Sequence, residues 1–97
     1  MAAYLIFSLL EITDQEAFDE YGSKVRAVLD NCGARVLAAD PEPKVLEGEW
    51  RGIRNGIIEF PDMDAAERFY NSDDYKPLLD TRLGATRGGN VIAMNGI

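Results

Sequence analysis

The sequence contains no histidine, and this absence excludes several kinds of chemistry. A Ser-His-Asp triad, a Cys-His pair, a histidine-liganded zinc ion and a haem with a proximal histidine all require an imidazole. The single cysteine, Cys32, cannot form a disulfide within the chain, and no histidine is near it to activate its thiol. We interpret Cys32 as a small, partly buried apolar side chain.

Positive charge is also scarce in this chain of 97 residues. Seventeen Asp and Glu against 10 Lys and Arg give a formal net charge of −7, which argues against nucleic acid or an anionic membrane as the main partner. No apolar run approaches the roughly 20 residues of a membrane helix. The apolar run Met1–Leu10 lacks the basic residues of a signal peptide and leads directly into Glu11. We therefore expect a cytoplasmic protein with one domain, residues 1–97.

The first third of the chain predicts a strand, a helix and a stop. Ala3–Ile12 is a nearly continuous apolar run, which is typical of a central strand. Thr13 and Glu16 have the spacing of a capping box, with Thr13 as the N-cap. The helix that follows carries one apolar stripe: Phe18, Tyr21, Val25, Val28 and Leu29. Asn31-Cys32-Gly33 ends it, with Gly33 in the left-handed conformation.

The middle of the chain predicts three strands. Ala34–Ala39 is one, and the two prolines of Asp40–Pro43 make a turn after it. Lys44–Glu49 is expected to fold back as an edge strand. A loop from Arg51 then leads to turn chemistry at Asn55-Gly56, and Gly56–Phe60 is a third full strand.

The last part predicts two helices and a strand. Asp62 caps a short helix over residues 65–70, and Ser72 caps the next one. One face of this second helix is expected to carry Tyr75, Leu78, Leu79 and Leu83. Pro77 fits only near its start. Gly84 and Gly88-Gly89 end the helical region, and Asn90–Asn95 is the last strand.

This order is β-α-β twice, with an extra edge hairpin between the two units. Right-handed crossovers then place the helices on one face of a four-stranded antiparallel sheet, which is the ferredoxin-like βαββαβ arrangement of an α+β protein. Both sides of the first strand are mostly apolar, so the face without helices needs a cover. No spare segment can supply it. We predict a homodimer through this open sheet face, with a shared interior between the two sheets.

Glu59 is the strongest catalytic candidate, because it lies between Ile58 and Phe60 on a strand that the topology makes central. Burial of an unpaired carboxylate costs several kcal/mol. If the open face becomes the interior of a barrel, Glu59 projects into it beside Ser8 or Tyr4, with the raised pKa of a general acid or base. The alternative is a structural pairing of Glu59 with an arginine.

Several residues are candidates for substrate binding. Arg54, with Arg51, is the nearest arginine to Glu59 in the sequence; it either clamps a carboxylate or is an exposed loop charge. Trp50 forms either an aromatic wall or part of the dimer interface. Tyr75 lines a cavity mouth or belongs to the core. Arg82 reaches inward or makes a surface ion pair with an acid such as Asp74 or Asp80. We predict no metal site and no cofactor.

An ordered set of short segments resembles the DUF1330 family of the dimeric α+β barrel superfamily. The segments run through essentially the whole chain: 3–6, 18–21, Gly33, 46–50, 58–61, 65–70, 72–75 and Arg82. The resemblance implies a ferredoxin-like fold and a barrel-forming dimer. It implies no reaction, because the function of the family is unassigned. Related branches of the superfamily include cofactor-free monooxygenases, muconolactone-type isomerases, haem-degrading enzymes and ligand-sensing regulators.

Three functions therefore stay open. The first is a cofactor-independent enzyme with oxygenase- or isomerase-like acid–base chemistry on a small organic molecule in the barrel cavity. In this case Glu59 moves a proton, and Arg54 or Arg82 balances charge. The second is a non-catalytic protein that binds or senses a small molecule in the same cavity. The third is a structural module whose sheet face serves only for dimerisation.

Overall fold

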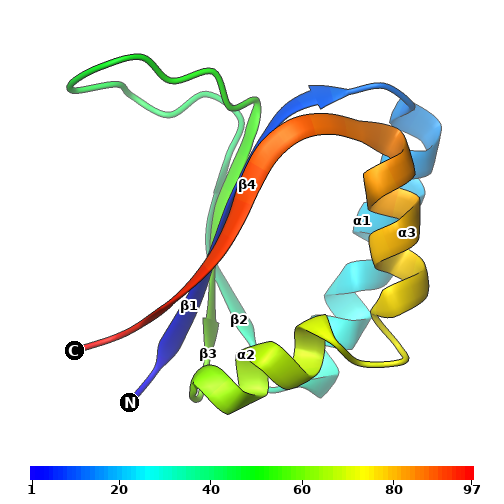
Figure 1. Cartoon of the computed structure of the whole chain (residues 1–97), viewed down its shortest axis with the longest axis vertical. Coiled ribbons are helices and arrows are strands. Elements are labelled where there is room, and N and C mark those ends of the chain that lie inside the picture. Colours follow the sequence, from blue (N-terminus) through cyan, green and yellow to red (C-terminus); the bar gives the residue numbers. More distant parts are fainter.

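A four-stranded antiparallel sheet carries all helices on one of its faces (Figure 1). The computed structural model describes residues 1–97. The elements are β1 (Ala3–Ile12), α1 (Gln15–Asn31), β2 (Arg35–Asp40), β3 (Arg54–Phe60), α2 (Met63–Tyr70), α3 (Lys76–Ala85) and β4 (Thr86–Asn95). The strand order is β2-β3-β1-β4, and every neighbouring pair is antiparallel. The predicted ferredoxin-like fold is confirmed.

The helix ends follow from local hydrogen bonding. The predicted N-cap of α1, Thr13, was wrong: the cap is Asp14. The N–H groups of both Thr13 and Asp14 donate to the Ala85 carbonyl, at 2.8 and 3.3 Å. The Asp14 side chain accepts the N–H of Ala17 at 3.1 Å. Gly33 ends the first helical segment with a φ of 71°, as predicted. Asp62 caps α2 and accepts the N–H of Ala65 at 2.8 Å, also as predicted.

The last helix and strand differ in their bounds from the prediction. Ser72 caps only a short turn, in which its Oγ accepts the Tyr75 N–H at 3.1 Å, so α3 begins at Lys76. The prediction for Leu83 was wrong, because this side chain is 59% exposed. Neither Gly84 nor Gly88-Gly89 separates α3 from the last strand. With φ values of 76° and 119°, Gly88 and Gly89 bend β4 within the sheet, and a side chain at Gly89 would collide with the Ser8 carbonyl.

The predicted edge strand over Lys44–Glu49 does not form. Residues 41–53 make an irregular arm that leaves the sheet between β2 and β3, seen at the upper left of Figure 1. Asn55 lies in β3 rather than in a hairpin turn, and its side chain holds the base of the arm. Its Nδ2 donates to the carbonyls of Asp40 and Gly52, both at 3.0 Å, and its Oδ1 accepts the Trp50 indole N–H at 2.9 Å.

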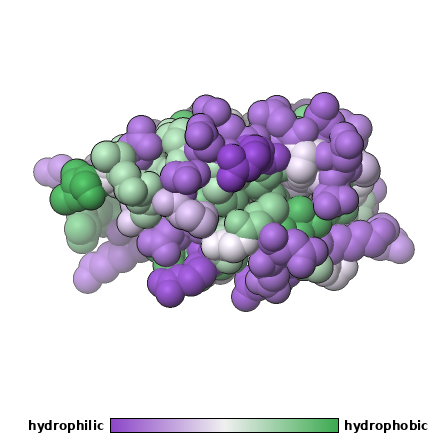
Figure 2. Space-filling model, turned by 90° about the horizontal axis from the view of Figure 1, so that it is seen from below, coloured by the Kyte–Doolittle hydropathy of each residue, from purple (hydrophilic) through white to green (hydrophobic).

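The hydrophobic core lies between the sheet and the helices. Alternate residues of β1 point toward it, and Ala3, Leu5 and Leu9 are buried there. The other residues of β1 point to the open face, where their neighbours Ile57, Ile92 and Met94 are 37–50% exposed. Figure 2, which views the molecule from below, shows apolar atoms at the surface on the end that carries the sheet. No helix has the length and apolar character needed to span a membrane.

Candidate functional site

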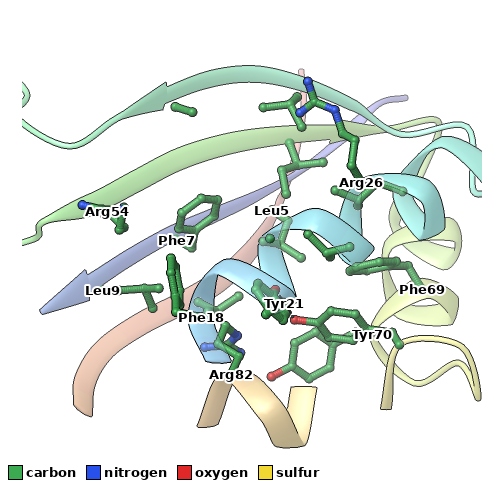
Figure 3. A pocket seen from close by; sticks show the side chains of 18 residues that line it. Leu5, Phe7, Leu9, Phe18, Tyr21, Arg26, Arg54, Phe69, Tyr70 and Arg82 are labelled. Carbon is green, nitrogen blue, oxygen red and sulfur yellow. Dashed lines mark hydrogen bonds between the residues drawn. The ribbon is translucent and has the colours of Figure 1, made fainter. Parts of the chain in front are cut away.

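A cavity of about 230 Å³ lies on the helix side of the sheet, lined by the strands, by α1, by the end of α2, by Tyr75 and by Arg82 of α3. Most of its wall is apolar, as Figure 3 shows for Leu5, Phe7, Leu9 and Phe69. Its polar groups are tyrosine hydroxyls and guanidinium groups, and they come from Tyr21, Arg26, Arg54, Tyr70, Tyr75 and Arg82. No carboxylate lines this cavity, so any charge that the wall carries is positive.

Arg82 is the buried charge of this cavity. It lies in the last turn of α3 and is only 6% exposed. The surface ion pair with Asp74 or Asp80 does not form, and Arg82 makes no ion pair with any other residue. Its guanidinium lies instead beside the hydroxyls of Tyr75 and Tyr21. Burial of a cation without a carboxylate partner carries a desolvation cost, which here only neutral hydroxyl groups offset, so Arg82 is a candidate for binding an anion.

Two tyrosines complete the polar end of the cavity. The hydroxyl oxygens of Tyr21 and Tyr75 are 2.8 Å apart, and one hydroxyl donates its proton to the other. Tyr21 comes from the apolar stripe of α1, and Tyr75 immediately precedes α3, so this bond joins the two helices. The Tyr75 ring also packs against Phe69 and Tyr70, with ring centres 4.4 and 5.7 Å away. These contacts fix the orientation of the hydroxyl pair.

The protonation of this cluster follows from its burial. Burial raises the pKa of Tyr21 far above its ordinary value of about 10, and the neighbouring Tyr75 raises it further, which the Arg82 charge offsets only in part. Burial lowers the pKa of Arg82, but the adjacent tyrosine oxygens more than compensate, so this pKa is raised overall. At neutral pH the cluster therefore offers the Arg82 cation and the protonated hydroxyl of Tyr21, which together suit an anionic oxygen.

Two further arginines lie at the margins of the cavity (Figure 3). Arg54 comes from the start of β3, and its guanidinium lies 6.0 Å from the centre of the Phe18 ring while it donates to the Ile53 carbonyl at 2.8 Å. Arg26 comes from α1 and is exposed. Neither makes an ion pair. The whole chain has a net charge of −7, but the cavity wall contains three arginines and no acid, so its charge is positive.

The predicted catalytic residue, Glu59, lies on the opposite face of the sheet from this cavity. It stands directly across from Tyr4 on β1 and Arg35 on β2. Its Oε1 is 3.5 Å from the Arg35 Nε, and its side chain is 30% exposed. Arg35, rather than Arg54 or Arg51, is therefore its arginine partner.

The structure thus divides the predicted site residues between two places. Arg54, Tyr75 and Arg82 line the helix-side cavity. Tyr4, Ser8 and Glu59 lie on the open face, where Ser8 stands across from Asn55. Trp50 lies in the arm, beside the groove that the arm forms with Ile6 and Ile57 of the open face.

Tyr21, Tyr70, Phe18 and Arg26 were not predicted as site residues. The available signal was Tyr21, the one hydroxyl in the apolar stripe of α1. A polar atom on a core-facing stripe needs a partner, and this topology places α1 against α3. The partner itself depends on the packing of the two helices, which periodicity does not reveal.

The model of the family described as "Domain of unknown function (DUF1330)" matches residues 2–97. The chain belongs to the DUF1330 family. No curated protein matches this DUF1330 chain in sequence.

Solved structures share the fold of this DUF1330 protein. A protein of unknown function from Rhodopseudomonas palustris has a TM-score of 0.83 at 16% identity, over 99% of this chain and 82% of the other. A dimeric ferredoxin-like protein of unknown function from Jannaschia sp. CCS1 has a TM-score of 0.70 at 15% identity, over 99% and 100%. A protein from Nitrosomonas europaea, named as a candidate antibiotic biosynthesis monooxygenase, has a TM-score of 0.66 at 13% identity, over 100% and 99%. These identities show a common fold and no more.

Proposed function

We propose that this DUF1330 protein binds a small organic anion in its helix-side cavity. The observation that carries the proposal is Arg82, a buried guanidinium without a carboxylate partner that faces an apolar cavity. A guanidinium forms strong, bidentate hydrogen bonds with a carboxylate, and such bonds are stronger when water is excluded. The hydroxyl pair of Tyr21 and Tyr75 supplies a further donor to the same anionic oxygen.

The same arrangement supports a second candidate, which is cofactor-independent catalysis on the bound molecule. A cation and a protonated phenol aimed at one oxygen stabilise an enolate or another oxyanion as it forms. Stabilisation of the developing negative charge is one of the two tasks in an isomerase- or oxygenase-like reaction, and removal of the proton is the other. The specific observation in its favour is the protonated hydroxyl of Tyr21 beside Arg82. The cavity wall holds no carboxylate to act as the base, so in this scheme the substrate arrives already ionised or is deprotonated by solvent.

The open sheet face supports a homodimer. Ile57, Ile92 and Met94 are exposed there, and the tip of the arm carries Leu46, which is 84% exposed. Apolar patches of this kind mark interaction surfaces in proteins. Stacking of the two open faces would bury this patch, and the Jannaschia relative is described as dimeric. In such a dimer Glu59 would lie between the two sheets beside Tyr4. The open face around Glu59 is therefore the alternative to the helix-side cavity as the place where a proton is transferred.

Variants of Arg82 and Glu59 distinguish a site in the helix-side cavity from a site on the open face. We expect organic anions to stabilise the protein against heat, by about 2.7 kcal/mol at one hundred times the dissociation constant. For a domain of this size each kcal/mol raises the Tm by about 4–8 °C. Arg82→Gln should abolish the stabilisation, whereas Arg68→Gln, which changes an exposed arginine of α2, and Glu59→Gln should preserve it. Loss of stabilisation in Glu59→Gln alone would move the site to the open face.

A further inference from the structure

The shape and chemistry of the cavity specify its ligand more narrowly than charge alone. Resting on the proposed anion site, we propose that the natural ligand class is a monocyclic aromatic monocarboxylate, with its ring among the aromatic side chains and its carboxylate at Arg82. Three independent features of the cavity support this class: its volume, the composition of its wall and the number of hydrogen-bond donors at its polar end.

The volume admits one ring. An apolar cavity of about 150 Å³ is known to hold benzene, and drug-sized ligands occupy about 300–1,000 Å³. At about 230 Å³, this cavity has room for one six-membered ring and one small substituent. Drug-sized ligands and long acyl chains exceed it.

The wall favours an aromatic ring over an aliphatic body of the same size. Six aromatic side chains line the cavity: Phe7, Phe18, Tyr21, Phe69, Tyr70 and Tyr75. Neighbouring rings among them have centres 4.4–6.3 Å apart in tilted or edge-on arrangements. This is the range in which aromatic pairs gain about 0.5–1.5 kcal/mol beyond the burial of their surface. A flat ligand ring can continue this cluster, whereas a puckered ring makes only apolar contact.

The polar end matches a carboxylate with one charge. The Arg82 guanidinium can direct a fork of two N–H groups at two oxygens, and the Tyr21–Tyr75 pair has one O–H left after their mutual hydrogen bond. These donors satisfy most of the acceptor positions of a carboxylate. A phosphate monoester brings a second charge, for which the buried end of the cavity offers no second cation. Arg54, at the margin, is already engaged with Ile53.

The test is a calorimetric titration of the full chain with four probes of matched size: benzoate, cyclohexanecarboxylate, benzamide and phenyl phosphate. We expect benzoate to bind most tightly. Cyclohexanecarboxylate should bind about 2- to 12-fold more weakly, which is the aromatic contribution converted to affinity. Benzamide lacks the charge and should bind at least about tenfold more weakly, because a hydrogen bond to a charged group contributes about 1.5–3 kcal/mol. Phenyl phosphate should bind no more tightly than benzoate.

Two variants distinguish the preference for an aromatic ring from the binding of an anion, on which that preference depends. Phe18→Leu, which removes one half-buried ring of the six, should narrow the difference in affinity between benzoate and cyclohexanecarboxylate. Arg82→Lys keeps the charge without the fork and should weaken both acids, which provides a readout if Arg82→Gln does not fold. Equal affinity of the two acids for the unaltered protein would overturn the aromatic class and leave the anion site intact. Benzamide binding as tightly as benzoate, or no binding of either acid, would overturn the anion site itself.

Discussion

The hydroxyl pair of Tyr21 and Tyr75 allows the polar end of the cavity to be tested without a ligand. Their oxygens are 2.8 Å apart and connect α1 to the residue that precedes α3. An intramolecular hydrogen bond of this kind contributes about 0.5–1.5 kcal/mol to stability. Replacement of either tyrosine by phenylalanine removes this bond while preserving the ring packing. Each single variant should therefore be destabilised by about 1 kcal/mol, which lowers the Tm of a domain of this size by about 4–8 °C.

The decisive quantity is the non-additivity of the two changes. Both single variants lose the same bond, so Tyr21→Phe/Tyr75→Phe should be less destabilised than the sum of the two by about 1 kcal/mol. Urea unfolding of the four proteins at neutral pH measures this coupling. A matched control pairs Tyr21→Phe with Tyr4→Phe, because Tyr4 lies on the other face of the sheet, and that pair should be additive. A coupling for Tyr21 and Tyr75 below about 0.3 kcal/mol would refute the arrangement of the site.

Two further predictions concern alkaline pH and assembly. The pKa of Tyr21 is raised in the folded state, so its contribution to stability is fully present below pH 10 and is lost above it, where the unfolded chain releases this proton first. Above pH 10 the free energy of unfolding should therefore fall more steeply in the unaltered protein than in Tyr21→Phe, by up to about 1.4 kcal/mol per pH unit. Urea unfolding at pH 9–11 measures this difference, and parallel curves for the two proteins would contradict the burial of this hydroxyl. The proposed dimer predicts that the unaltered protein sediments as a dimer in analytical ultracentrifugation. Ile57→Lys, which places a charge in the middle of the open face, should then sediment as a monomer, whereas Leu83→Lys, at an exposed position on α3, should not change the sedimentation. An unaltered protein that sediments as a monomer would exclude the stacked sheets.

Local chemistry was sufficient to predict most of the fold. The two apolar sides of β1 implied a central strand with a face left bare, and both features are present. Asp62 and Gly33 act where capping rules place them, because these rules depend on only a few neighbouring residues. The choice between Thr13 and Asp14 as N-cap was not local. The backbone N–H groups of both residues donate to the Ala85 carbonyl, which is distant in sequence and sets how the chain enters the helix.

The arm and the site depended on tertiary contacts and were harder to predict. Asn55-Gly56 has the local chemistry of a hairpin turn, but in the structure the Asn55 side chain bonds to both ends of the arm while its backbone stays in β3. Glu59 stood out because a carboxylate on a central strand is anomalous, and a neighbour on β2, Arg35, satisfies it. Arg82 could be proposed from its helical spacing, but only the packing of α3 shows that it lacks an acid partner.

The location of the arginines explains how a protein with many acidic residues could bind the proposed anionic ligand. A net charge of −7 acts at long range, where salt screens it within about 8 Å at physiological ionic strength. It disfavours large polyanions, which must approach many surface acids at once. A small carboxylate that enters the cavity meets only Arg82 and the tyrosine hydroxyls at close range, and there the exclusion of water strengthens their attraction. Added salt should therefore weaken the binding of benzoate only slightly, because the interacting charges are buried together.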